Sequence, residues 1–475
     1  MAGLLAAIYL LTSVLIASHR LFWYDEIYTV AISRLPDVAT IWKALAHSSD
    51  SQPPTYYMVV RIFEKLPIPR EVAARLPSAL AMVAGMLITF DCARRLSDGV
   101  HGLIAFSVLS CSALCYYGYE ARPYALYFML ASLALWLWIH ASDASKLSSV
   151  LFGVVIFLAV AVHYYAVLCL VPYAVWEVSN WRLARAPCGK LIAGCLGVLC
   201  AAALFARQIL ALREFSGHFW SRPTFSSLAA IFTDFFPNGL FPLAAIMILV
   251  ALGGPREKGA MASAMQPYEQ LGWFFGLIPV AGFILATLGT GAFYNRYFIA
   301  ILPGIAVAFS CLLWRQFRSA PRISIAALML LATLGLGIQF ALVRYPGLVR
   351  PPSAKSEPER MNAMFQLEDK IQPAAKQFIV LPANDLLGPE ARYYSKHPER
   401  YVFLVGSHSP DQITRGLIKL GQYYPMVFWT LEDLIAHARE AALVQPSQAT
   451  IDALDRAGYK VTGRIDGGLQ VVSVE

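Results

Sequence analysis

Long apolar runs recur through the first three-quarters of this chain, and they constrain its fold more than any other feature. A helical run of about twenty apolar residues matches the thickness of the hydrocarbon core of a bilayer. Apolar residues make up 58% of the chain and charged residues only 14%, whereas a soluble domain carries about 25% charged residues. The composition therefore predicts a polytopic α-helical membrane protein.

Eleven apolar runs are candidates for transmembrane helices. They are residues 3–21, 74–92, 100–117, 124–140, 149–162, 164–178, 191–210, 240–252, 271–290, 297–314 and 323–343. The apolar stretch 56–66 is too short to span and predicts an interfacial helix instead. The first run lacks the positive n-region of a signal peptide, so we expect an uncleaved helix.

The basic residues of the short loops predict how these helices are oriented. The net charge is +8, with +9 before Tyr345 and −1 from Tyr345 onward, so the basic excess belongs to the first part of the chain. By the positive-inside rule, the loops that contain Arg94-Arg95, Lys146, Arg182, Lys258 and Arg318 are cytoplasmic. The opposite, outer side of the membrane then receives Asp25-Glu26, Glu120, His163, Arg296 and the C-terminus. The basicity suits anionic membrane lipids, and the sequence contains no nucleic-acid-binding motif.

The composition changes after Pro351-Pro352, which predicts a second domain. We expect residues 1–344 to form the membrane domain, with a first outer loop at 22–71, and residues 345–475 to form a small periplasmic α/β domain. The predicted strands are 378–381, 401–405 and 426–429, with a hairpin of 460–464 and 470–474. The predicted helices are 389–395, 411–420 and 448–457.

An acidic pair, Asp25-Glu26, follows the first apolar run and the aromatic residues Phe22-Trp23-Tyr24. Charges so close to hydrocarbon are costly and are usually retained for a reason. The pair has a simple interpretation, as interfacial charge that caps or snorkels. It also has a catalytic one, in which a carboxylate at the membrane surface acts as general base on an acceptor hydroxyl while its neighbour assists.

Three further polar segments fall on the predicted outer side. Glu120-Ala-Arg-Pro-Tyr124 is either a polar turn that starts the next helix at Pro123, or a carboxylate and a guanidinium that face a substrate. His163 is either a structural histidine or a site residue. Arg296 is either a snorkeling side chain or a phosphate contact.

The sequence names no cofactor with certainty. A divalent metal remains open because the outer carboxylates and His163 could converge, although Asp-x-Asp and His-Glu-x-x-His motifs are both missing. The eight cysteines include no Cys-x-x-Cys pair and are expected to be inert small hydrophobes.

Five motifs, taken in order and spacing, resemble the GT-C superfamily of glycosyltransferases. They are Asp25-Glu26, His47 with Gln52-Pro-Pro-Thr-Tyr-Tyr57, Arg75-Leu-Pro-Ser-Ala-Leu80, Glu120-Ala-Arg-Pro-Tyr124, and Arg296-Tyr297 with Leu302-Pro-Gly304. They cover residues 1–314. Within the superfamily the chain is similar to the bacterial members of the protein-mannosyltransferase-like family, which include lipid A aminoarabinose transferases and rhizobial galacturonosyltransferases.

The resemblance implies an inverting transfer of a sugar from a polyprenyl-phosphate donor to lipid A, a glycan or a protein, in an active site that faces the periplasm. Asp25 matches the position of the family's catalytic acidic residue, with Glu26 beside it, and Arg296 is a plausible phosphate contact. The family often has His or Glu directly before Pro-Pro, where this chain has Gln52. The other substrate-binding candidates on these motifs are His47, Pro54, Tyr57, Arg75, Glu120, Arg122, Tyr124 and Tyr297. His163 and Tyr164, which lie between two apolar runs outside the five motifs, are further substrate-binding candidates.

Two other functions remain open at this point. A surface-polysaccharide polymerase or ligase would use the same kind of lipid-linked substrate. A lipid-linked sugar transporter or flippase is less compatible with the sequence, because transporters tend to show paired repeats and broken helices at mid-membrane, and this chain concentrates its polar residues in outer loops instead.

The predicted orientation can be tested with reporter fusions. Alkaline phosphatase, which is active only in the periplasm, should be active when fused after Val343 and silent when fused near Arg185, because an odd number of spans separates the cytoplasmic N-terminus from the C-terminal domain. The reverse pattern would overturn the orientation, and with it the periplasmic placement of the site.

Overall fold

The computed structural model describes residues 1–141, 145–180, 188–215, 219, 221–235, 267–317, 335, 337, 341, 357–371, 378–406, 412–466 and 469–474. The chain divides into two compact units. The first consists of Met1–Arg20 and Gln52–Arg344, and the second of Leu21–Ser51 and Tyr345–Glu475. The sequence assigned the whole first outer loop to the membrane domain, whereas the structure groups its first part, 21–51, with the C-terminal part of the chain.

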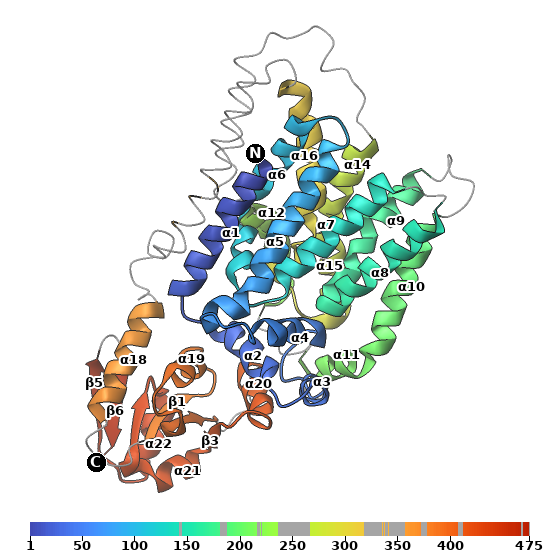
Figure 1. Ribbon diagram of the computed structural model, residues 1–475. Helices are drawn as coiled ribbons and strands as arrows, with labels where there is room; N and C mark the ends of the chain where they lie inside the picture. The colour runs from blue at the N-terminus through green and yellow to red at the C-terminus, as the bar shows by residue number, and fades with distance from the viewer. Residues whose placement is uncertain are drawn as a thin grey trace. The chain divides into compact units, whose positions relative to one another are not determined.

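The first unit is a bundle of helices (Figure 1). Its described α-helices are α1 (Ala2–His19), α4 (Pro54–Phe63), α5 (Arg70–Arg94), α6 (Gly99–Ser110), α7 (Tyr124–His140), α8 (Lys146–Val162), α9 (Leu170–Ser179), α10 (Gly189–Leu204), α11 (Ala206–Ala211), α12 (Phe225–Phe235), α14 (Pro267–Phe274), α15 (Ile278–Leu285) and α16 (Ile301–Phe317). Shorter helical turns are η1 (Ala113–Tyr119), η2 (Tyr164–Cys169), η3 (Leu212–Phe215), η5 (Phe275–Leu277), η6 (Ala286–Thr290) and η7 (Asn295–Phe298).

Three helical stretches of the described residues are long and apolar enough to cross a membrane, namely Ala2–His19, Arg70–Arg94 and Pro267–Thr290. Six of the other predicted spans correspond to shorter apolar helices of this bundle, and α12 is a further apolar helix that lies outside all of the predicted spans. The predicted span 240–252 lies outside the described residues, as does nearly all of 323–343. The count of eleven spans therefore stays a prediction.

Helices α5 and α7 lie side by side and run in the same direction (Figure 1). Between them, Thr89 Oγ1 donates a hydrogen bond to Ser132 Oγ at 3.2 Å, with both side chains buried. Small polar groups of this kind bridge helices inside an apolar bundle because no water is there to satisfy them. The parallel pair therefore has one end near Ser78 and Tyr124 and another near Asp91 and His140.

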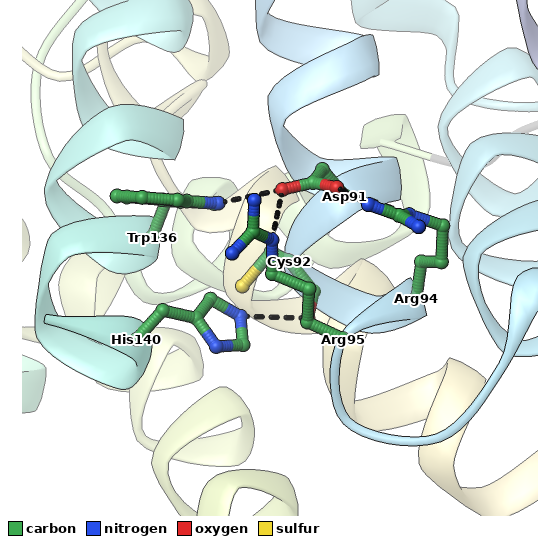
Figure 2. Close-up of polar contacts among 6 residues, drawn as sticks. All are labelled: Asp91, Cys92, Arg94, Arg95, Trp136 and His140. Atoms are coloured by element: carbon green, nitrogen blue, oxygen red, sulfur yellow. Dashed lines mark hydrogen bonds and ion pairs between the residues drawn. The ribbon is translucent and has the colours of Figure 1, made fainter.

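A charged cluster marks the second of these ends (Figure 2). The carboxylate of Asp91 accepts hydrogen bonds from Arg94, Arg95 and the indole of Trp136, at 2.5 to 3.0 Å. Arg95 also lies over the Trp136 ring, 5.2 Å from its centroid. These contacts hold the ends of α5 and α7 together at the side that the basic residues predict to be cytoplasmic.

Close approaches at two glycines set the packing at two other helix contacts. A Cβ atom on Gly197 of α10 would lie 2.3 Å from the carbonyl oxygen of Gly153 on α8, so only glycine fits there. A Cβ atom on Gly304 of α16 would lie 2.1 Å from the ring of Phe275. Small residues at helix contacts are typical of membrane bundles, and the Pro303-Gly304 motif therefore has a packing function.

The second unit contains a six-stranded mixed sheet with the strand order β3-β2-β1-β4-β6-β5. The strands are β1 (Phe378–Pro382), β2 (Tyr401–Leu404), β3 (Val427–Trp429), β4 (Ala441–Val444), β5 (Val461–Asp466) and β6 (Leu469–Val474). The pairs β3-β2, β2-β1 and β1-β4 are parallel, whereas β4-β6 and β6-β5 are antiparallel. Three predicted strands and the predicted hairpin are present, but the sequence missed β4.

Helices cover both faces of this sheet (Figure 1). On one face, α18 (Glu357–Ile371) and α19 (Leu387–Tyr394) pack with Ile379 and Leu381. On the other, α21 (Leu431–Ala436) and α22 (Gln448–Arg456) pack with Val380 and Leu443. The alternation along β1 follows from the two-residue period of a strand. The remaining described elements are α20 (Gln412–Gly421), η9 (Pro398–Arg400) and η10 (Ala438–Glu440).

The segment 21–51 of the second unit is helical, where the sequence predicted a loop. It contains α2 (Tyr24–Ser33) and α3 (Val38–Ala46). The α3 helix begins with Asp37 as N-cap, whose carboxylate accepts a hydrogen bond from the Thr40 amide at 2.7 Å. The α2 helix contacts α19, which explains why the segment groups with the C-terminal part of the chain.

Candidate functional site

The residues that the sequence predicts for the site divide between the two units. Asp25, Glu26 and His47 belong to the second unit. The other ten belong to the first unit, and they are Pro54, Tyr57, Arg75, Glu120, Arg122, Tyr124, His163, Tyr164, Arg296 and Tyr297. Each set has its own local structure.

The acidic pair lies in the first turn of α2, which has Trp23 as its N-cap. Backbone amides without intrahelical partners and the helix dipole both favour carboxylates at this position. Glu26 is fully buried, and its Oε2 accepts a hydrogen bond from the Trp23 amide at 3.2 Å. Asp25 is only partly buried. Glu26 therefore caps its own helix, and Asp25 is the more accessible carboxylate of the two.

Two tyrosines of α2, Tyr24 and Tyr28, lie beside the acidic pair in the sequence and contact each other. The hydroxyls of Tyr24 and Tyr28 are 2.8 Å apart, and their ring centroids are separated by 4.9 Å. Burial raises the pKa of Tyr28 well above its usual value, and the neighbouring Tyr24, Asp50 and Asp25 raise it further. Tyr28 therefore keeps its proton at neutral pH and remains a neutral hydrogen-bonding group near the carboxylates.

His47 lies at the C-terminal end of α3, away from the first turn of α2 in the sequence. Its Nδ1 atom is hydrogen bonded to the hydroxyl of Tyr423, and the two ring centroids are 6.0 Å apart. This contact fixes the end of α3 against the segment that follows α20. A substrate-binding role for His47 stays a prediction.

In the first unit, three of the sequence motifs meet through a chain of hydrogen bonds. The hydroxyl of Tyr56, from the Pro-Pro-x-Tyr-Tyr segment, lies 2.6 Å from Ser78 Oγ. Ser78 Oγ in turn donates to the carbonyl oxygen of Arg122 at 3.1 Å. All of these groups are buried, and a buried polar group without a partner is costly. The chain therefore fixes the turn that carries Glu120 and Arg122 against α4 and α5.

Arg75 has a structural contact that the sequence did not predict. Its side chain is 1% exposed, and its Nη1 atom donates to the carbonyl oxygens of Ala17 at 3.1 Å and of Arg20 at 2.6 Å. These carbonyls belong to the end of α1, where the last carbonyl groups have no partners within the helix. Arg75 therefore caps α1, and its predicted role in substrate binding stays a prediction.

Glu120 forms an ion pair with Arg20, a residue that the sequence analysis missed. Arg20 Nη2 lies 3.5 Å from Glu120 Oε1 and donates a hydrogen bond to the hydroxyl of Tyr116 at 2.5 Å. The guanidinium also lies over the Tyr116 ring, 5.0 Å from its centroid. The carboxylate of Glu120 is fully buried, so this pairing offsets the cost of burying its charge. The sequence feature that could have identified Arg20 is its position as a basic residue at the end of the first apolar run.

His163 occupies the break between α8 and η2, among tyrosine rings. It stacks on Tyr127 with a centroid distance of 5.3 Å and an interplanar angle of 4°. The rings of Tyr124 and Tyr297 lie 5.6 Å and 5.4 Å away. Its Nδ1 atom accepts a hydrogen bond from the Tyr165 amide at 3.3 Å. This bond places the acceptor nitrogen toward the backbone and fixes the orientation of the ring.

Arg296 lies beside the same aromatic cluster. Its guanidinium carbon is 5.4 Å from the ring centroid of Tyr124, 5.1 Å from that of Tyr294 and 6.0 Å from that of Tyr297. The side chain is 8% exposed, and that of Arg122 is 3% exposed. Aromatic faces attract a guanidinium and hold it without neutralising its charge.

The two arginines act on the protonation of His163. Burial lowers the pKa of His163 to about 3, and the positive charges of Arg122 and Arg296 contribute to the shift. His163 is therefore neutral at physiological pH. The positive charge of this cluster comes from the two guanidiniums, which both lie close enough to the imidazole to influence it.

The remaining candidates of the first unit lie in α4 and η2. Pro54 occupies the first turn of α4, where its missing amide hydrogen costs nothing. Tyr57, one turn further, is 1% exposed. Tyr164 packs edge-to-face on Phe205, with the ring centroids 6.4 Å apart. A substrate-binding role for these three residues stays a prediction.

Metal ligation was left open by the sequence. Within the described parts of the chain, no group of three or more His, Cys, Asp or Glu side chains is arranged to hold a metal ion. Carboxylates and imidazoles are the ligands that such a site would need. The metal requirement therefore stays an open question for experiment.

The neutral state of His163 predicts a pH dependence of stability. Its pKa of about 3 in the folded protein lies below the ordinary 6.5. The unfolded chain therefore binds the proton first as the pH falls. The contribution of His163 to stability is complete above about pH 6.5 and is lost progressively toward pH 3, by at most about 1.4 kcal/mol per pH unit. His163→Phe keeps a ring at this position and should remove this contribution.

The measurement is the unfolding temperature of wild type and variant at pH 7.5 and pH 5.0 in one detergent. His437→Phe, at an exposed histidine, serves as the control and should keep the wild-type pH dependence. An equal loss of stability in wild type and His163→Phe would contradict the buried neutral imidazole.

One family model matches part of the chain. The model described as dolichyl-phosphate-mannose-protein mannosyltransferase matches residues 51–206. This stretch contains the Tyr56–Ser78–Arg122 hydrogen-bond chain as well as Glu120 and His163. No curated protein sequence matches the chain.

Solved structures of ArnT from Cupriavidus metallidurans are similar to nearly the whole chain. The crystal structure in the apo state aligns with a TM-score of 0.62, and the one bound to undecaprenyl phosphate aligns with a TM-score of 0.60. In both cases the sequence identity is 14%, and the match covers 99% of this chain and 97% of that chain. The predicted resemblance to the GT-C glycosyltransferases is therefore confirmed at the level of the fold: this chain has the fold of ArnT.

Proposed function

We propose that this protein is a membrane glycosyltransferase that moves a sugar from a polyprenyl-phosphate donor to an acceptor, with inversion at the anomeric carbon. The observation that carries the proposal is the pair of buried arginines, Arg122 and Arg296, around the neutral His163. A chain with the fold of ArnT and fixed positive charge among aromatic rings suits a donor that has a lipid tail and a phosphate leaving group.

The phosphate needs positive charge for a physical reason. As the bond between the anomeric carbon and the phosphate oxygen breaks, the leaving polyprenyl phosphate takes the electron pair and gains negative charge. Preorganised cations in a poorly hydrated site stabilise this charge without having to reorganise. Guanidinium groups also bind phosphate through two parallel hydrogen bonds. We assign this role to Arg296, with Arg122 as the second candidate.

The acceptor needs a base. Its hydroxyl or amine attacks the anomeric carbon from the face opposite the phosphate, and its proton must be removed as the new bond forms. Asp25 suits this role because it is the less buried member of the acidic pair, whereas Glu26 caps α2. We therefore assign proton removal to Asp25 and the shaping of its helix to Glu26.

The substrates are proposed by chemical class. A polyprenyl-phosphate-linked sugar is the donor, which is supported by the undecaprenyl phosphate bound in the similar ArnT structure. Lipid A, another glycan or a protein is the acceptor. The proposed location is the bacterial inner membrane, with the reaction on the periplasmic side. The charge pattern of the short loops supports this orientation.

Removing the charge of Asp25 tests the proposed base. Asp25→Asn keeps the size of the side chain and should lower turnover by at least about 100-fold, within the range that general base catalysis contributes. The measurement is transfer from a polyprenyl-phosphate sugar by the purified protein, followed by mass spectrometry of the product. Glu26→Gln should be impaired less, because its amide oxygen can still accept the Trp23 hydrogen bond.

Asp455→Asn is the matched control for this experiment, since Asp455 is an exposed carboxylate of α22 in the same unit. It should have wild-type turnover. Wild-type turnover of Asp25→Asn itself would remove Asp25 from the role of base.

Substitution of Arg296 tests the proposed phosphate contact. Charge-assisted hydrogen bonds contribute roughly 1.5–3 kcal/mol, so Arg296→Ala should raise the donor KM by about 10-fold or more. Arg296→Lys keeps the charge but loses the two-pronged geometry and should fall between the alanine variant and wild type. The measurement is the initial rate as a function of donor concentration.

Arg222→Ala, at an exposed arginine ahead of α12, is the control and should leave the donor KM unchanged. If Arg296 only snorkels, both of its variants should also retain the wild-type donor dependence. That result would reject Arg296 and transfer the assignment to Arg122.

A further inference from the structure

The N-terminus of α2 is held by a carboxylate that lies 366 residues further along the chain. Glu390 of α19 is 5% exposed, and its Oε1 atom accepts a hydrogen bond from the Tyr24 amide at 2.7 Å. Tyr24 is the first residue of α2 and directly precedes Asp25. Its amide is one of those that a helix leaves without an internal partner.

The same face of α19 holds a second amide of this segment. The hydroxyl of Tyr394 accepts a hydrogen bond from the Phe22 amide at 2.8 Å. Glu390 and Tyr394 are four residues apart, which places them one above the other on a helix. The Phe22 ring also packs on the rings of Tyr393 and Tyr394, with centroid distances of 5.8 Å and 6.5 Å. The N-terminal end of α2 is thus fixed by two hydrogen bonds from backbone amides to side chains of α19, and by an aromatic contact.

The other end of α2 contacts the same helix. Arg34, the C-cap of α2, donates to the Tyr393 hydroxyl at 3.1 Å. Contacts at both ends restrict the rotation of α2 about its axis as well as its position. The direction in which Asp25 projects from the first turn depends on that rotation.

We propose that Glu390 is a positioning residue for the reaction: its buried carboxylate fixes the first turn of α2 and thereby the placement of Asp25. The proposal rests on the proposed function, in which Asp25 is the base. It assigns Glu390 no contact with a substrate. Displacing a catalytic group by about 1 Å can lower a rate about 100-fold, so the helix that carries the base needs such an anchor.

The test compares Glu390→Ala with Glu390→Gln in the purified full-length protein. Glu390→Ala removes the acceptor and should lower kcat by about 10- to 100-fold, while the donor KM stays within about 2-fold because the phosphate contact is assigned to Arg296. Glu390→Gln keeps an acceptor oxygen at the same reach and should retain kcat within about 3-fold. Loss in the alanine variant with rescue by glutamine is the expected pattern.

Glu368→Ala is the matched control for general destabilisation. Glu368 is a buried carboxylate of the same unit that accepts hydrogen bonds from Ser395, His397 and Tyr401. Its partners all lie outside α2. If Glu368→Ala lowers kcat as much as Glu390→Ala does, the effect comes from loosening of the unit, and the positioning role is overturned.

Hydrogen–deuterium exchange supplies a readout that does not depend on activity. Glu390→Ala should speed exchange at least about 10-fold in a peptide that covers residues 22–28, with unchanged exchange in β1 and β4. Tyr394→Phe removes only the second acceptor and should give a smaller change in the same peptide. This variant keeps the test valid if Glu390→Ala does not fold.

The two readouts separate failure of this proposal from failure of the proposed function. Unchanged exchange near residue 24 overturns the anchor, whatever the activity of Asp25→Asn. Faster exchange with wild-type kcat overturns the link between the anchor and catalysis. If Asp25→Asn is fully active while Glu390→Ala still shows faster exchange and lower kcat, the anchor positions another group of α2, and Asp25 loses its role instead.

Discussion

The hydrogen-bond chain from Tyr56 through Ser78 to the Arg122 carbonyl is the interaction on which the first-unit site depends. Inside an apolar bundle, a hydroxyl that loses its partner cannot turn to water, so each link constrains the next. The chain joins the consecutive helices α4 and α5 to the turn ahead of α7. The positions of Glu120, Arg122 and Tyr124 all follow from that turn.

Tyrosine rings surround the positive charge of the same site. Arg296 lies over three tyrosine rings, and His163 is held neutral by burial and by the two arginines. Glu120 forms an ion pair with Arg20, the C-cap of α1. A phosphate bound beside these guanidinium groups would interact with a positive charge that the tyrosine rings do not neutralise.

The functional motifs could be found in the sequence, but most of the contacts that hold them in place could not. The motifs carried recognisable residue types, and the strands β1, β2 and β3 showed apolar runs between turn signals. The strand β4 was missed because Ala441-Ala442-Leu443-Val444 is buried throughout and rich in alanine, so it shows neither alternation nor strand propensity. The contacts of Arg20, Arg75 and Glu390 were missed because their partners are backbone atoms or distant residues, which leave no local pattern.

The second unit is built from two distant parts of the chain, and this has a consequence for how α2 forms. A ten-residue helix is only marginally stable alone in water. Two bonds that order its N-terminus come from Glu390 and Tyr394, which are synthesised long after α2 itself. The entropy of closing so long a loop grows only slowly with its length, so the late partner can still order the helix effectively. The acidic pair is therefore expected to reach its final geometry only when α19 has packed on the sheet of the second unit.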